Sequence, residues 1–96
     1  QEKRHYSPGK KIVLIPFEGT LPSILNPDVL ITWKPNKSSH NSLSLDGSEI
    51  SGASRVFSIL RELDNPKIGK IYIERAPKKG LGKAINDRLE RAAYPF

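Results

Sequence analysis

Residues 70–93, which read KIYIERAPKKGLGKAINDRLERAA, contain the pattern that decides the fold. Ile71 and Ile73 alternate with polar residues, which predicts a strand over 70–75 with one face in the core. A basic connection containing glycine follows over 76–82. Apolar residues then recur at helical spacing, which predicts a closing amphipathic helix whose inner face carries Leu81, Ala84, Ile85, Leu89 and Ala92.

A second helix and three more strands are predicted upstream of this unit. The helix begins at a Ser51 cap and stops at Asp64-Asn65-Pro66, with Ala53, Val56, Phe57, Leu60 and Leu63 recurring along one side. Strands are predicted over 11–17, 29–33 and 42–45, the last two being separated by a polar loop. Residues 11–17 are apolar on both faces, which predicts the centre of the sheet. Residues 20–25 fit either a short helix or a loop.

The resulting order, β-β-β-α-β-α, predicts an α+β fold: a small mixed or antiparallel sheet of about four strands packed with two main helices. A chain of 96 residues has room for one core. We therefore expect a flexible basic arm over 1–10 and a single domain over 11–96. The absence of Cys excludes disulfides and thiol chemistry. Apolar runs are too short to span a bilayer, which predicts a soluble chain, and no pattern calls for a cofactor.

The net charge of +6 is unevenly distributed along the chain. Residues 1–17 carry +3, residues 18–64 carry −2 and residues 65–96 carry +5. A basic block of this kind is typical of proteins that contact nucleic-acid phosphates, although it is also found on surfaces that are simply solvated. The charge predicts nucleic acid, RNA in particular, as the partner.

The connection before the last helix is the predicted phosphate site. Free N–H groups and the positive end of the helix dipole favour an anion there. Glycines allow the backbone to come close to an anion, and neighbouring cations add positive charge. Phosphate binding is therefore predicted for Arg75, Lys78, Lys79 and Lys83. A plain glycine-rich entry to a helix explains the same residues. Tyr72, on the polar face of the preceding strand, is the candidate for stacking on a base. Phe17, Trp33 and Phe57 lie in apolar patterns and are expected in the core.

His40 and Glu74 are the candidate catalytic residues. Histidine titrates closest to neutral pH, and a carboxylate with nearby cations completes what metal-independent RNA cleavage needs. An exposed loop histidine and a surface salt bridge are the structural alternatives. Asp28 and Glu74 also resemble, faintly, the carboxylate pair of restriction-endonuclease-like nucleases, which would hold a metal. Ala76 stands where that family has Lys.

Residues 79–93, which run from Lys79 to Ala93 in a small, basic, cysteine-free chain, resemble the C-terminal toxin domains of bacterial contact-dependent inhibition and polymorphic toxin systems. The resemblance implies a nuclease secreted as part of a larger protein, acting in a target-cell cytoplasm and neutralised by an acidic immunity protein. The leading hypothesis is therefore a toxin-type ribonuclease that cleaves tRNA or rRNA. The alternatives are a non-catalytic nucleic-acid-binding or protein-interaction module and a metal-dependent nuclease.

Overall fold

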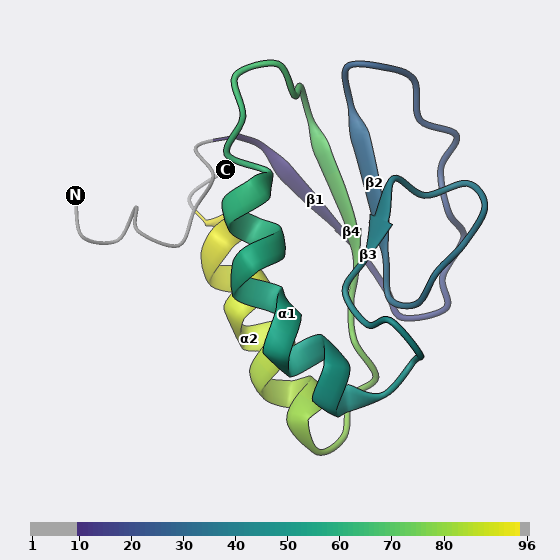
Figure 1. Ribbon diagram of the computed structural model, residues 1–96, viewed down its shortest axis with the longest axis vertical. Coiled ribbons are helices and arrows are strands. Elements are labelled where there is room, and N and C mark those ends of the chain that lie inside the picture. The colour runs from purple at the N-terminus through teal and green to yellow at the C-terminus, as the bar shows by residue number, and fades with distance from the viewer. Residues whose placement is uncertain (1–9, 95–96) are drawn as a thin grey trace.

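The computed structural model describes residues 10–94 and confirms the α+β fold (Figure 1). Four strands and two helices follow one another as β1 (Ile12–Ile15), β2 (Val29–Thr32), β3 (Asn41–Ser42), α1 (Glu49–Glu62), β4 (Ile71–Glu74) and α2 (Leu81–Ala93). Residues 1–9 of the arm expected over 1–10 lie outside the described residues, and the arm stays a prediction. Residues 20–25 form a loop.

The strands form one sheet in the order β1-β4-β2-β3, and all three neighbouring pairs are parallel. The sheet is therefore parallel rather than antiparallel. The central position predicted for residues 11–17 is wrong, because β1 lies at an edge and β4 lies between β1 and β2. An edge strand can still be covered on both faces, so its two-sided apolar character did not report its position in the sheet.

Both helices pack on one face of the sheet (Figure 1). Side chains alternate along β4, so that Ile71 and Ile73 point into the layer between sheet and helices. This layer also contains residues from each helix, including Val56, Ile59, Ile85 and Leu89. The core therefore occupies the space between the β-sheet and α1 with α2.

Residues on the other face of the sheet are buried as well. Leu30 is fully buried and Ile15 is 6% exposed, although neither belongs to the helix-side core. The connection over 16–28 leaves the lower end of β1 and returns past β2 and β3 to the upper end of β2 (Figure 1).

The helix ends differ slightly from the prediction. Ser48, not Ser51, caps α1: its side chain accepts a hydrogen bond from the backbone N–H of Ser51 at 3.1 Å. Close contact between α1 and the sheet depends on Gly52, because a Cβ there would lie 2.5 Å from the Trp33 ring. Within residues 10–94, neither helix is long and apolar enough to cross a membrane.

Candidate functional site

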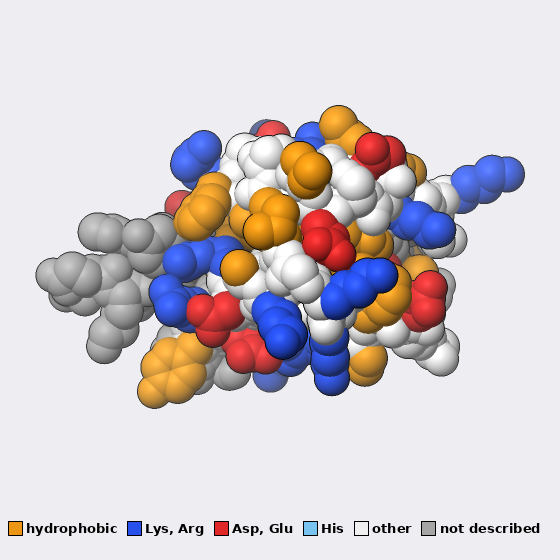
Figure 2. Space-filling view, turned by 90° about the horizontal axis from the view of Figure 1, so that it is seen from below, with side chains coloured by type: hydrophobic (Ala, Val, Ile, Leu, Met, Phe, Trp, Pro, Cys, Tyr) orange, Lys and Arg blue, Asp and Glu red, His pale blue; other side chains and the backbone are white. Residues whose placement is uncertain are grey.

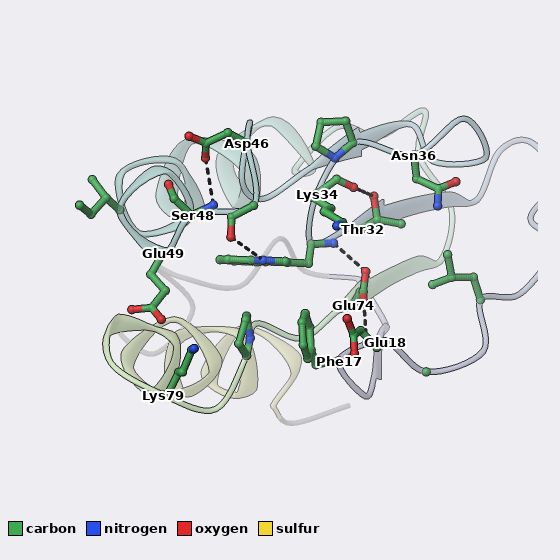
Figure 3. A pocket seen from close by; sticks show the side chains of 17 residues that line it. Phe17, Glu18, Thr32, Lys34, Asn36, Asp46, Ser48, Glu49, Glu74 and Lys79 are labelled. Atoms are coloured by element: carbon green, nitrogen blue, oxygen red, sulfur yellow. Dashed lines mark hydrogen bonds between the residues drawn. The ribbon is translucent and has the colours of Figure 1, made fainter.

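A pocket of about 790 Å³ opens at the carboxyl edge of the sheet, where β1, β2 and β4 end (Figure 3). Loops after these strands form its floor, and the start of α1 forms one wall. Ligands in open parallel sheets bind at this edge, because the loops that leave the strands diverge there. The carboxyl-edge pocket is lined by Phe17, Glu18, Gly19, Leu21, Thr32, Trp33, Lys34, Pro35, Asn36, Asp46, Gly47, Ser48, Glu49, Ile50, Glu74, Pro77 and Lys79.

Glu74, the last residue of β4, ties the loops of its two neighbouring strands together. Its Oε2 accepts the backbone N–H of Glu18 at 2.8 Å, and its Oε1 accepts that of Trp33 at 2.8 Å (Figure 3). The residue is 8% exposed. Glu18 has a left-handed backbone with φ of 60°, which costs a non-glycine residue about 1–2 kcal/mol. The bond from Glu74 helps to hold that conformation at the pocket floor.

Glu49 occupies the helix terminus where the sequence predicted a phosphate. Its Oε1 accepts the N–H of Leu81, the first residue of α2, at 3.1 Å. Gly80, with φ of 53°, lies against the same carboxylate, and a Cβ there would overlap Glu49 Oε1. A side chain of the protein itself therefore complements the positive end of the α2 dipole.

Asp46 stabilises the turn that leads into α1. Its Oδ1 accepts the N–H of Ser48 at 2.9 Å and the hydroxyl of Ser44 at 3.3 Å. Hydrogen bonds from Ser48 favour the carboxylate form and lower the pKa of Asp46 from its ordinary 3.8. Asp46 therefore contributes a negative charge to the pocket at neutral pH.

Three of the four predicted phosphate-binding residues gather beside α2. Arg75, Lys78 and Lys83, which we name the basic strip, line a depression of about 260 Å³ together with Asn86, Asp87 and Glu90. Figure 2 shows Lys and Arg side chains clustered with acidic ones on this end of the molecule. Arg75 pairs with Glu90 at 2.6 Å, and Asp87 pairs with Arg91 at 3.0 Å. Lys78 and Lys83 form no ion pair with any residue over 10–94.

The fourth residue of the predicted phosphate set lies elsewhere. Lys79 lines the carboxyl-edge pocket and lies near Glu49 (Figure 3). The connection between β4 and α2 thus sends neighbouring lysines to two different surfaces.

The predicted catalytic pair does not share a pocket. His40 is exposed, and its Nδ1 accepts a hydrogen bond from the backbone N–H of Leu30 at 3.0 Å. The backbone N–H of His40 donates to the backbone carbonyl of Leu30 at 2.8 Å. His40 lies one strand spacing from Leu30, and Leu30 lies one strand spacing from Tyr72 on β4. Glu74 is two residues further along β4, so the backbones of His40 and Glu74 are about 12 Å apart. The imidazole serves to attach the start of β3 to β2.

The carboxylates of the metal alternative lie at opposite ends of the sheet. Asp28 Oδ1 accepts the N–H of Lys70 at 2.8 Å, just before β4, whereas Glu74 ends that strand. Four residues along a strand correspond to about 13 Å, too far for one metal ion. Among the residues that the structure describes, no group of three or more His, Asp or Glu side chains could hold a metal.

The Tyr72 ring is half-buried on the sheet face away from the helices, and the side chain of Lys70 lies against it. Lys70 Nζ lies 5.6 Å from the ring centroid, a cation–π contact. A base that stacked on Tyr72 would have to displace this ammonium. Base stacking by Tyr72 stays a prediction.

Several pocket residues were missed by sequence reasoning. Phe17 was expected in the core but is 36% exposed at the pocket. Glu49 lies before the helix that was predicted to begin at Ser51, and no local pattern marks it, because its bond to Leu81 spans 32 positions. A local signal did exist for Asp46: the sequence Asp46-Gly47-Ser48 just before a helix is typical of a capping turn.

These features define a class of protein: a two-layer α+β domain with a parallel sheet, a pocket at the carboxyl edge of that sheet and a basic strip beside α2. The model of the family described as threonylcarbamoyl-AMP synthase, C-terminal domain, matches residues 1–94. The chain therefore belongs to this family. No curated protein and no solved structure matches the chain.

The family match overturns the toxin resemblance. The similarity to polymorphic toxin domains rested on the style of residues 79–93 and on the basic composition, both of which other basic domains share. Secretion and an immunity protein, which the resemblance implied, have no support from the family. The toxin-type ribonuclease interpretation is wrong for the same reason.

Proposed function

We propose that this chain is a non-catalytic domain of a threonylcarbamoyl-AMP synthase and that it binds RNA, tRNA in particular, through the basic strip. The observation that carries the proposal is the convergence of Arg75, Lys78 and Lys83 on one depression. They belong to a segment, residues 65–96, whose net charge is +5. Because Lys78 and Lys83 have no acidic partner within residues 10–94, their charge is available for phosphates.

The placement of the acid–base candidates supports a binding role rather than cleavage. Both oxygens of Glu74 accept backbone N–H groups, and Nδ1 of His40 accepts another. Hydrogen bonds of this kind and a backbone separation of about 12 Å favour a structural role for both residues, because general acid–base catalysis needs both groups within reach of one substrate.

The test is binding of fluorescently labelled tRNA, followed by anisotropy over a series of salt concentrations. Each phosphate contact contributes roughly −0.7 to −0.9 to the slope of log K against log salt. Changing both Lys78→Gln and Lys83→Gln should weaken binding and make the slope shallower by about 2. The matched control is Lys37→Gln with Lys67→Gln, which removes the same charge from exposed positions outside the strip.

Equal loss of affinity in the control pair would contradict a specific strip, because net charge alone would then explain binding. The same preparations are incubated with tRNA, rRNA and plasmid DNA, with and without EDTA, and no fragments are expected. RNA fragments that disappear in His40→Ala or Glu74→Ala would contradict the non-catalytic role.

A further inference from the structure

The carboxyl-edge pocket has a charge opposite to that of the whole chain. Its lining contains four carboxylates, Glu18, Asp46, Glu49 and Glu74, and two cations, Lys34 and Lys79. The pocket therefore carries −2 in a chain that carries +6. Phosphates are repelled from such a lining, so the pocket and the basic strip attract different partners.

Oxygen atoms in the pocket remain available as acceptors. Glu74 uses both of its oxygens on backbone N–H groups, whereas Asp46 and Glu49 each use one. Within residues 10–94, the Glu18 carboxylate and the second oxygens of Asp46 and Glu49 accept no hydrogen bond. Neither Lys34 nor Lys79 forms an ion pair with them. The lining thus has more accepting capacity than the described chain itself satisfies.

Apolar surface surrounds these acceptors. Phe17, 36% exposed, turns its ring toward the cavity (Figure 3). Ile50, 75% exposed, lines the pocket from the first turn of α1. Aromatic faces attract guanidinium groups, which also stack on rings and bind carboxylates with two parallel hydrogen bonds. An ammonium ion lacks this flat, forked geometry.

We infer that the carboxyl-edge pocket receives an arginine side chain carried by another protein segment. The charge of the lining selects a cation, and the ring of Phe17 beside free carboxylate oxygens selects a guanidinium. The cavity of about 790 Å³ is larger than one side chain needs, so the residues flanking the arginine would cover Phe17 and Ile50. Aromatic residues and arginine are enriched at such interfaces. The inference does not depend on RNA binding by the basic strip.

The test compares two blocked peptides, acetyl-Gly-Leu-Arg-Leu-Gly-amide and the same peptide with citrulline in place of arginine. Citrulline has the shape of arginine but no charge. Amide spectra of the ¹⁵N-labelled chain should show saturable shifts at Gly19, Gly47 and Ile50 with the arginine peptide. Because hydrogen bonds to a charged group are worth about 1.5–3 kcal/mol, the citrulline peptide should bind at least about tenfold more weakly.

Two variants keep the test specific. Glu18→Gln with Glu49→Gln removes two charges while leaving an oxygen for Leu81 N–H, and should weaken the arginine peptide by about fivefold. Glu62→Gln with Asp64→Gln, at exposed positions outside the pocket, should leave its affinity unchanged.

Equal binding of the citrulline peptide would overturn the inference, as would shifts confined to the basic strip or no saturable shift at all. Agmatine supplies the guanidinium without a peptide. If agmatine bound as tightly as the arginine peptide, the protein segment would be the wrong source of the group.

Discussion

Replacing Glu74 by glutamine tests whether its carboxylate stabilises the fold by binding the loops after β1 and β2. The substitution keeps the size of the side chain but turns one accepting oxygen into an NH₂ donor. Either the N–H of Trp33 or that of Glu18 then faces a donor, and both bonds are 2.8 Å long in the native protein. A buried donor left without a partner costs about 1–3 kcal/mol. The charge-assisted character of the remaining bond is lost as well.

We therefore expect Glu74→Gln to lower the free energy of unfolding by about 2–3 kcal/mol, and Glu74→Ala by about 3–5 kcal/mol. Urea denaturation followed by the fluorescence of Trp33, the single tryptophan, measures both. Glu62→Gln, on the exposed side of α1, is the control and should change little. A loss below about 0.5 kcal/mol in Glu74→Gln would refute the structural role. A carboxylate kept for chemistry would give that result.

Two further predictions concern the pocket's surroundings. Gly82→Ala should cost about 2–4 kcal/mol in urea denaturation, because the new Cβ would overlap the carbonyl oxygen of Pro77, while the exposed neighbour Lys83→Ala should cost little. Because alanine favours helix more than glycine does, an unchanged or raised stability in Gly82→Ala would contradict the overlap. Asp46 has its pKa lowered below 3.8, so its contribution to stability is present above that pH and disappears as pH falls through the folded value. The urea midpoint of wild type should therefore exceed that of Asp46→Asn near neutral pH and converge with it in strong acid; a constant gap would contradict this.

The secondary structure could be predicted because its signals are local. Alternation at Ile71 and Ile73 and helical spacing over 81–92 each depend on residues a few positions apart, and β4 and α2 lie where these patterns predict. The position of β1 could not be predicted in this way. Residues 12–15 are buried at Ile12 and Ile15 and half-buried between them, and neither this burial nor the apolar run says whether the strand is central or at an edge.

The burial of aromatic residues could also be predicted only in part from the sequence. Trp33 was expected in the core and is 2% exposed, but Phe57 was expected there and is 47% exposed. Phe57 lies on the amphipathic helix one position after the buried Val56, at the border of its apolar side. Its ring packs under the Arg88 guanidinium, 4.9 Å from the ring centroid. Spacing alone does not say on which side of that border a large side chain falls.

The candidate sites depended on contacts that sequence distance conceals. A phosphate was predicted at the α2 terminus, and the carboxylate of Glu49, from 32 positions upstream, accepts a hydrogen bond there. The division of charge along the chain was more informative. Acidic residues of segment 18–64 line the carboxyl-edge pocket, and basic residues of segment 65–96 line the strip.

This separation has a geometric cause. Parallel strands bring all their carboxyl ends to one edge, so the loops after β1 and β2 and the turn before α1 meet there with their acidic residues. The connection after β4 leads to α2 and places Arg75 and Lys78 beside residues of that helix, in the depression that Lys83 also lines. Lys79 lines the carboxyl-edge pocket, and its positive charge makes the net charge of the pocket lining −2 rather than −3. Removing that lysine should therefore strengthen any cation held there, whereas removing Lys78 should affect the strip alone.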